Sequence, residues 1–188
     1  MESLKTAGRI SKGLTLTSDD FIESHASRLL LLVLLCGSKD RATSTQKIEG
    51  LTKLAKLDFF VRYPAFFQRA AQALGHDTVA TENSNSDSKM IRFHYGPWDK
   101  RYYQVIPYLE AKGLLTVTKK ASAYNFTLTE LGTRIARQLS EGNGFESLVA
   151  KMAKVKEVMS PLKGNQLKEL IYKLFEQEVA NKKLNDII

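Results

Sequence analysis

The chain has 188 residues, of which 43% are hydrophobic and 26% are charged. This composition is typical of a globular domain, and it excludes a disordered chain, a collagen-like repeat and a bundle of membrane-spanning helices. Lysine and arginine outnumber aspartate and glutamate by 28 to 20, and the excess is concentrated in residues 61–140. A basic excess favours a nucleic acid or an acidic protein as partner, so we look for a binding surface in this middle third first.

Other features of the sequence narrow the class of protein. Cys36 is the only cysteine, which excludes an intrachain disulfide and a cysteine-rich zinc site. The longest apolar run, residues 29–36, is much shorter than the ~20 residues that span a bilayer. Residues 1–3 lack the basic and apolar regions of a secretory signal. We therefore expect a cytoplasmic protein.

The first half of the chain predicts three helices after a polar, flexible arm over residues 1–17. The first helix runs from about residue 19 to 36, is capped within residues 18–20, and should be the central buried helix because its second half is apolar on all sides. Residues 37–40 predict a turn.

A second helix, capped by Ser44 or Thr45, is expected to run to about Phe60. It would place Lys47, Lys53 and Lys56 towards solvent. A third helix, residues 64–74, should end at Gly75, and a polar loop over residues 76–89 should follow.

The second half begins with a predicted half-buried strand over residues 90–95. Residues 96–99 should turn the chain into a helix over about 99–112, with Asp99 as its N-cap. A β-hairpin over residues 114–128 follows, with a basic tip at 119–123. Thr129 should cap a helix over 130–140, and two further helices should flank a turn at residues 161–164.

This order of elements is that of a winged helix. The most specific segment is Tyr124–Gly132, in which a strand ending in Leu-Thr enters a helix through Glu-Leu-Gly, and Gly132 would let that helix lie close to the core. We therefore predict a mainly α fold with a small β-hairpin wing. The winged helix-turn-helix core spans residues 18–141 with an inserted helix and loop at about 62–89, and a C-terminal helical extension spans residues 142–188.

Two sequence blocks, Ile48–Pro64 and Tyr95–Tyr103, resemble the middle component of bacterial ABC-three-component systems. That family includes the small accessory subunit of Lamassu-type antiviral and anti-plasmid defence, and the resemblance covers roughly residues 20–140. It implies a non-enzymatic adaptor in a complex with an SMC-like ATPase that senses foreign DNA and with an effector nuclease. The sequence has no Gly-rich phosphate loop, so the ATP would belong to the partner and no cofactor is expected here.

A stripe of polar side chains on the helix at 99–112 is the first candidate binding surface. Residues three or four apart share a helix face, and such a face would read base edges in a major groove or contact a protein partner. The alternative is an ordinary solvated face. The opposite side, Val105, Ile106 and Leu109, should face the core. The full candidate set for DNA or partner binding comprises Arg92, Lys100, Arg101, Gln104, Tyr108, Lys112, Lys119 and Lys120.

The remaining singled-out residues favour structural roles. Trp98 is interpreted as a core residue at the helix entry in preference to a partner anchor, and His25 and His94 as packing residues in preference to metal ligands. Cys36 should be an inert thiol whose pKa is raised by burial. No enzyme motif or metal site is found. The alternative function is a winged-helix DNA-binding transcription regulator, and the C-terminal helices either pack on the same core or bind a partner.

Overall fold

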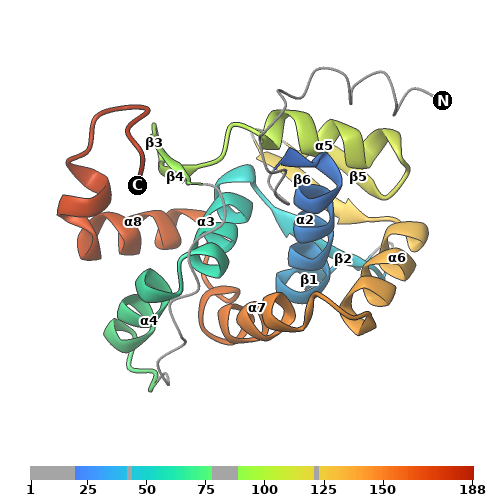
Figure 1. The fold of residues 1–188 in the computed structure, drawn as a ribbon, viewed down its shortest axis with the longest axis horizontal. Coiled ribbons are helices and arrows are strands. Elements are labelled where there is room, and N and C mark those ends of the chain that lie inside the picture. The colour runs from blue at the N-terminus through green and yellow to red at the C-terminus, as the bar shows by residue number, and fades with distance from the viewer. Residues whose placement is uncertain (1–19, 42–43, 78–88, 121–122) are drawn as a thin grey trace, which may run out of the picture.

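The computed structural model describes residues 20–41, 44–77, 89–120 and 123–188 (Figure 1). About 58% of these residues are helical, and their strands form a four-stranded and a two-stranded antiparallel sheet. The fold is therefore helix-dominated with a small antiparallel component. The predicted flexible arm at 1–17 and most of the predicted loop at 76–89 lie outside the described residues.

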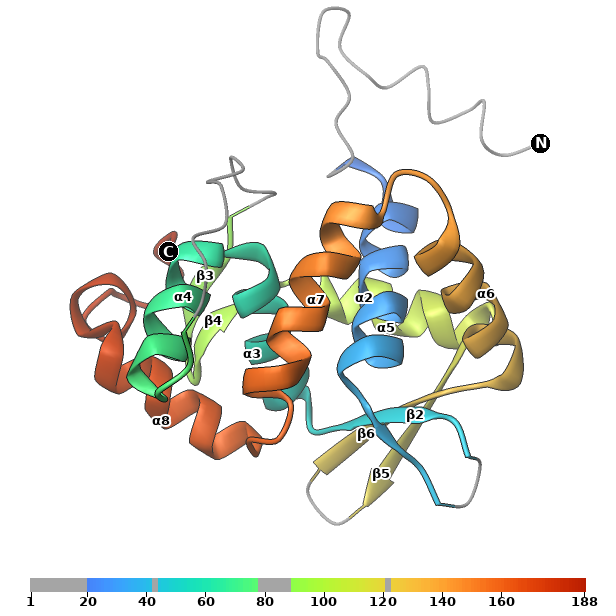
Figure 2. The ribbon, with the colours of Figure 1, turned by 90° about the horizontal axis from the view of Figure 1, so that it is seen from below.

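Helix α2 (Ile22–Cys36) is the central buried helix, as predicted. Residues 29–33 are all buried, and α2 contacts helices on several sides. Figure 2 shows it between α7 and α6, with the β5–β6 hairpin below its carboxyl end. The helix begins about three residues later than predicted, because Phe21 occupies the N-cap position and supplies no side-chain cap. Ser18 and Asp19 lie outside the described residues.

The predictions of a turn at 37–40 and of a helix starting near Ser44 were wrong. Residues Ser38–Lys39 form β1 and Gln46–Glu49 form β2, which pair with each other antiparallel. Ile48 had been counted with the apolar positions of the helix that follows, but it is the one buried residue of β2 and pairs with Phe126. Gly50 adopts φ +91, which suits glycine and converts the strand into helix.

Helix α3 (Leu51–Arg62) is buried along most of its length. The prediction that Lys56 faces solvent was wrong, because its side chain is 0% exposed and its Nζ donates to the carbonyl oxygen of Pro97 at 2.9 Å. Strand β4 and helix α8 both pack against α3. They cover the face of α3 that carries Lys56, which the sequence pattern predicted to be solvent-exposed. The spacing of apolar residues within α3 does not indicate that these two distant segments pack there.

Helix α4 (Pro64–Ala73) matches the predicted third helix, and Gly75 follows it with φ +81. Strands β3 (Ile91–Phe93) and β4 (Gly96–Trp98) then form a hairpin. The predicted turn at 96–99 is therefore a strand, and the chain reverses just before it. Helix α5 (Tyr102–Ala111) begins later than predicted. Asp99 is not its N-cap; its carboxylate instead accepts from the backbone N–H of Arg101 at 3.0 Å.

The predicted hairpin and the helix after it are confirmed. Strands β5 (Leu115–Lys120) and β6 (Ala123–Leu128) pair antiparallel, and the larger sheet has the order β1-β2-β6-β5. Thr129 caps α6 (Glu130–Glu141) by accepting from the backbone N–H of Gly132 at 2.9 Å. A Cβ at Gly132 would lie 1.8 Å from the carbonyl oxygen of Leu114, so the close approach requires glycine there.

The C-terminal helices pack on the same core, which is the first of the two alternatives that the sequence left open. Helix α7 (Glu146–Met159) buries Met152 and Val155, and α8 (Gly164–Leu174) buries Leu167 and Ile171 in the same cluster. A π-helical turn, η2 (Glu176–Ala180), follows, and the last residues return to β3 through a bridge between Ile91 and Ile187. Among the described residues, none of the helices combines the length and the apolar composition that a membrane span needs.

Candidate nucleic-acid and partner interface

The structure divides the predicted polar stripe of α5. Arg101 turns inward, where its guanidinium donates to both carboxylate oxygens of Asp99 at 2.9 and 2.7 Å. Its Nη1 also lies 2.8 Å from Nε2 of His25. The prediction that Arg101 belongs to an exposed stripe was therefore wrong in part. The helix begins after this residue, and the buried Asp99 carboxylate draws its side chain in until 26% of it remains exposed.

The rest of the stripe is only partly available. Gln104 and Lys112 are exposed, whereas Tyr108 is half-buried and its hydroxyl donates to a carboxylate oxygen of Glu23 at 3.5 Å. The ammonium of Lys112 lies 5.6 Å from the centre of the Tyr108 ring. Lys100, just before the helix, is exposed. The core side of α5 is as predicted, with Val105, Ile106 and Leu109 buried.

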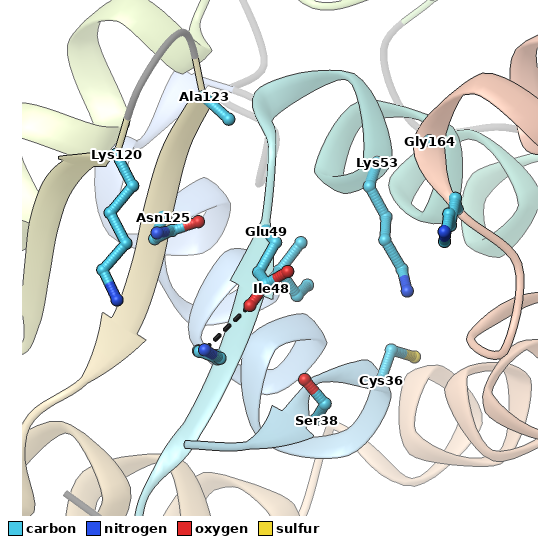
Figure 3. A pocket seen from close by; sticks show the side chains of 11 residues that line it. Cys36, Ser38, Ile48, Glu49, Lys53, Lys120, Ala123, Asn125 and Gly164 are labelled. Atoms are coloured by element: carbon cyan, nitrogen blue, oxygen red, sulfur yellow. Dashed lines mark ion pairs between the residues drawn. The ribbon is translucent and has the colours of Figure 1, made fainter. Parts of the chain in front are cut away.

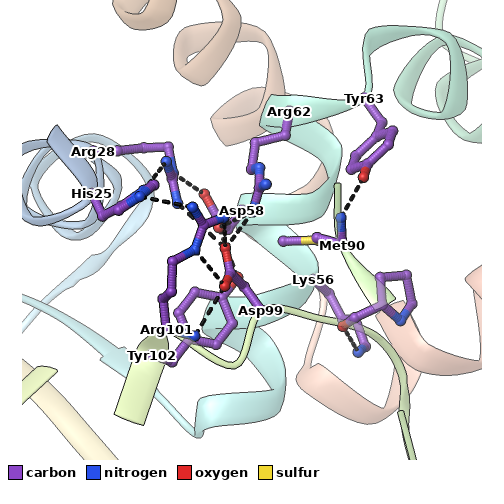
Figure 4. Close-up of polar contacts among 11 residues, drawn as sticks. His25, Arg28, Lys56, Asp58, Arg62, Tyr63, Met90, Asp99, Arg101 and Tyr102 are labelled. Carbon is purple, nitrogen blue, oxygen red and sulfur yellow. Dashed lines mark hydrogen bonds and ion pairs between the residues drawn. The ribbon is translucent and has the colours of Figure 1, made fainter. Parts of the chain in front are cut away.

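The inward turn of Arg101 joins it to a buried polar network (Figure 4). We define this network as His25, Arg28, Asp58, Arg62, Asp99, Arg101 and Tyr102. Arg28 Nε donates to Asp58 at 2.9 Å, and the Tyr102 hydroxyl donates to the other oxygen of the same carboxylate at 2.7 Å. Arg62 Nη1 lies 2.8 Å from Asp99. The network thus fixes the start of α5 against α2 and α3.

The electrostatics of the network are those of a structural element. Burial alone would raise the pKa of Asp99, but hydrogen bonds from Arg101 and the charge of Arg62 outweigh it and lower the pKa to about 2. Burial and the neighbouring Asp58 carboxylate raise the pKa of Tyr102 well above its usual value. Both groups therefore keep one protonation state near neutral pH, which fits positioning better than proton transfer.

The structure also places Trp98, Cys36 and the two histidines for which the sequence favoured structural roles. Trp98 is a core residue, 6% exposed and stacked on Phe93 with ring centres 5.7 Å apart. Burial raises the pKa of Cys36 to about 12, so the thiol stays protonated. His25 is buried as predicted, but in the polar network, and His94 is exposed instead of packed.

The other predicted cations lie at two separate places. Lys119 and Lys120 are adjacent in β5 and point to opposite faces of the sheet, since strand residues alternate. The ammonium of Lys119 lies 5.8 Å from the ring centre of Tyr124. Arg92 is on the smaller sheet, half-buried, with its guanidinium 5.6 Å from the ring centre of Tyr172 and donating to the carbonyl of Phe93. The eight candidate residues therefore do not form one surface.

A pocket of about 460 Å³ gathers cations that the sequence did not single out (Figure 3). Its floor is the outer face of β2 and β6, and its walls are the start of α3 and the turn before α8. Four lysines from four different segments line it, against one glutamate, Glu49. These lysines are Lys47, Lys53, Lys120 and Lys163. Only Lys120 was predicted. Lys47 was missed because β2 was interpreted as helix, which hid the face that Lys47 shares with Lys120. Lys53 and Lys163 were missed because they lie in separate segments that only the fold brings together.

The four ammonium groups differ in what they already contact. Lys47 forms ion pairs with Glu49 at 2.8 Å and with Asp40 at 3.0 Å. Lys53 donates to the carbonyl oxygen of Ser160 at 2.7 Å, and its burial lowers its pKa. Within the described parts of the chain, Lys120 and Lys163 form no ion pair, and both side chains are exposed. The pocket thus offers two ammonium groups to a ligand.

Comparison with known proteins leaves the chain without a match. No family model, no curated protein and no solved structure matches it. Over the described ranges, no group of three or more histidine, cysteine, aspartate or glutamate side chains is placed to hold a metal ion.

Proposed function

We propose that this chain is a winged-helix accessory subunit that acts as a non-enzymatic adaptor in a cytoplasmic SMC-like ATPase complex. The complex would sense foreign DNA, from phage or plasmid, and control an effector nuclease. The sequence carries this proposal through the two blocks that resemble the middle component of ABC-three-component systems. Several features of the structure support it, and each is described below.

The sheet order supports the winged-helix part. Strand β2 follows α2, pairs with β6, and is separated from β5 by β6. Helices α3 and α5 lie between β2 and the hairpin in the chain, so the core reads helix, strand, helix, helix, strand, strand. This is the element order of a winged helix with a first strand that the sequence pattern concealed. Helix α4 and the β3–β4 hairpin form the insertion.

The position of the two resembling blocks supports an adaptor. The first block contributes Asp58 and Arg62 to the buried network, and the second contributes Asp99, Arg101 and Tyr102. The blocks therefore meet inside the protein, at the junction of α3 and α5. Residues that fix such a junction specify a scaffold, and neither block places a nucleophile or an acid–base pair at the surface.

The observation that favours the adaptor over the regulator is the inward position of Arg101. A helix that reads bases presents arginine, glutamine or asparagine to the groove. The arginine here, Arg101, lies just before α5 and is held by Asp99. The exposed face of α5 instead carries Tyr103, which is 59% exposed, together with Gln104 and Pro107. Bulky exposed tyrosines are typical of protein interfaces. Sequence-specific DNA recognition by α5 is therefore not expected.

The regulator remains the second candidate because of the basic pocket beside the hairpin. A gel shift with the upstream DNA of its own gene, at two salt concentrations, separates the two functions. The adaptor predicts either no shift or a shift that is equal for unrelated DNA of the same length. A shift that is selective for the upstream sequence, and that is lost in Gln104→Ala, would establish the regulator.

Two further features are the core that the C-terminal helices share and the exposed turn of the β3–β4 hairpin. Helices α7 and α8 pack on α2 and α3, so the C-terminal segment stabilises the same scaffold. The β3–β4 hairpin exposes Tyr95, which is 58% exposed, at its turn. An exposed tyrosine at this turn suits contact with a protein partner.

A further inference from the structure

We propose that the lysine-lined pocket binds phosphate groups of a nucleic-acid backbone, so that a DNA strand crosses the outer face of the β2–β6 sheet. The inference deepens the proposed function, since it rests on DNA as the molecule that the complex senses. It assigns the contact to the pocket between β2, β6, α3 and the turn before α8. Neither α5 nor the whole tip of the β5–β6 hairpin is assigned this DNA contact.

The charge of the pocket is the first argument. Lys47, Lys53, Lys120 and Lys163 converge from segments that are distant in the sequence. Among the described residues that line the pocket, Glu49 is the one acidic side chain. Glu49 is already paired with Lys47. Like charges that surround one hollow repel each other, and a bound anion relieves that repulsion. A positive field concentrated in a concave surface attracts a polyanion.

The helix starts that border the pocket add to the same field. Helices α3 and α8 both begin at its wall, and neither has an acidic residue in its first turn. They touch, since a Cβ at Gly164 would lie 3.1 Å from the backbone nitrogen of Lys53. Helix amino termini carry partial positive charge, and a lysine there is unfavourable for the helix itself. Lys53 lies in this first turn of α3, where its ammonium is held by the carbonyl oxygen of Ser160 and adds its charge to that of the two helix starts.

The side chains that line the pocket favour contact with the phosphates of a nucleic acid over contact with its bases. Within the described parts of the chain, the residues that line the pocket include no aromatic side chain on which a base could stack. The polar groups beside the lysines are Ser38 and Asn125. Ammonium groups hold phosphates without reading sequence, so binding should be independent of sequence and strongly dependent on salt.

Adjacent lysines provide a matched test. Lys120 lines the pocket, and Lys119 is next to it in the chain with the same charge but on the opposite face. Likewise, Lys163 lines the pocket, and Lys173 is exposed at the other end of α8. Binding of a fluorescein-labelled DNA duplex to the full chain would be measured by anisotropy. The variants are K120Q with K163Q as the pocket double variant, and K119Q with K173Q as the control double variant.

We expect the pocket double variant to bind the duplex at least about tenfold more weakly, and the slope of log affinity against log salt to fall by about two. The control double variant should keep most of the affinity, and both should unfold at the wild-type temperature. Three results would overturn the assignment. They are no duplex binding by the wild type at low salt, an equal loss in the two double variants, or displacement of DNA by polyglutamate at a lower charge concentration than unlabelled DNA needs.

The outcome is separable from that of the proposed function. If the wild-type chain binds no DNA but still co-purifies with an SMC-like ATPase, only the assignment of the pocket as a DNA-binding site is overturned. If DNA binding depends on the pocket lysines but the chain recruits no ATPase, only the proposed adaptor function is overturned.

Discussion

The Nη1 atom of Arg62 lies 2.8 Å from the Oδ2 atom of Asp99, and both side chains are buried. Arg62 belongs to the first of the two resembling sequence blocks, and Asp99 belongs to the second. The contact therefore ties the end of α3 to the segment that leads into α5. It links the two blocks directly, across the α4 insertion that separates them in the sequence.

Replacement of Asp99 with asparagine should strongly destabilise the protein. The substitution removes the carboxylate that lies 2.8 Å from Arg62 and 2.7 Å from Arg101. The buried Arg62 guanidinium then keeps the Asp58 carboxylate, at 3.6 Å. Removal of one partner of a buried ion pair typically costs about 3–5 kcal/mol. Urea denaturation measures this free energy of unfolding. The control is Glu157→Gln on the exposed face of α7, and a loss no larger than that of the control would contradict a structural role for the network.

The same carboxylate sets a pH dependence below about pH 4. The pKa of Asp99 is lowered to about 2, whereas an aspartate in an unfolded chain titrates near 3.9. The contribution of Asp99 to stability is thus complete above the unfolded pKa and is lost as the pH falls through about 2. Thermal unfolding followed across this range should show a smaller drop in Asp99→Asn than in the wild type. Equal drops would show that other carboxylates carry the acid sensitivity.

Lys56 should make the protein more stable as the pH rises above 7. Burial lowers the pKa of Lys56 to about 7, with further contributions from Arg92 and Lys168, whereas an unfolded lysine titrates near 10.4. Above pH 7 the unfolded chain therefore binds more protons at this residue than the folded chain does. The free energy of unfolding should rise by up to about 1.4 kcal/mol per pH unit.

The test of Lys56 is the slope of stability between pH 7 and about 8.5, where the Cys36 thiol of the unfolded chain begins to titrate. Lys56→Met should flatten this slope, and Lys154→Met on the exposed face of α7 should leave it unchanged. A wild-type slope that persists in Lys56→Met would show that Lys56 is not the titrating group.

Gly132→Ala should prevent α6 from docking. The added Cβ would lie 1.8 Å from the Leu114 carbonyl oxygen, which is backbone and has no rotamer to yield. We expect a loss of about 4 kcal/mol or more in the free energy of unfolding. Gly113→Ala is the matched control, since its φ of +68 is strained but nothing lies within 4 Å, and it should cost about 1–2 kcal/mol. A smaller loss for Gly132→Ala than for Gly113→Ala would be inconsistent with this packing.

Cys36 should react with a thiol reagent only when the protein unfolds. Its side chain is 2% exposed, burial raises its pKa to about 12, and Sγ donates to the carbonyl oxygen of Met152 at 3.5 Å. At about pH 8 the native thiol is therefore almost entirely protonated. Labelling with an aromatic disulfide should be slow in buffer and complete in denaturant. Rapid stoichiometric labelling in buffer would mean that the wall of the pocket opens readily.

The elements that local signals specify were predicted well. The apolar run of α2, the Pro64 start of α4, the hairpin, and the Thr129 cap of α6 each depend on residues a few positions apart. The errors arose where distant segments decide. Gln46–Glu49 becomes a strand because β6 pairs with it, and Lys56 is buried because β4 and α8 cover it.

The candidate site shows the same limit. Periodicity placed Arg101 on an outward stripe, but α5 starts after it and Asp99 takes its side chain inward. The pocket was not foreseen because its four lysines come from β2, α3, β5 and the turn before α8. Each looks like an ordinary solvated lysine in its own segment. Their convergence depends on the register of β2 against β6 and on the contact between the starts of α3 and α8.

The central claim, that this chain is an adaptor on an SMC-like ATPase, is tested most directly by affinity purification of the tagged protein from its native host. The lysate is treated with nuclease, so that DNA does not bridge the partners, and the bound proteins are identified and quantified by mass spectrometry. The account predicts that an SMC-like ATPase is recovered in near-equal amounts, and that Asp99→Asn reduces the recovery. Recovery of the protein alone, as a dimer whose DNA is removed by the nuclease, would contradict the adaptor and favour the regulator.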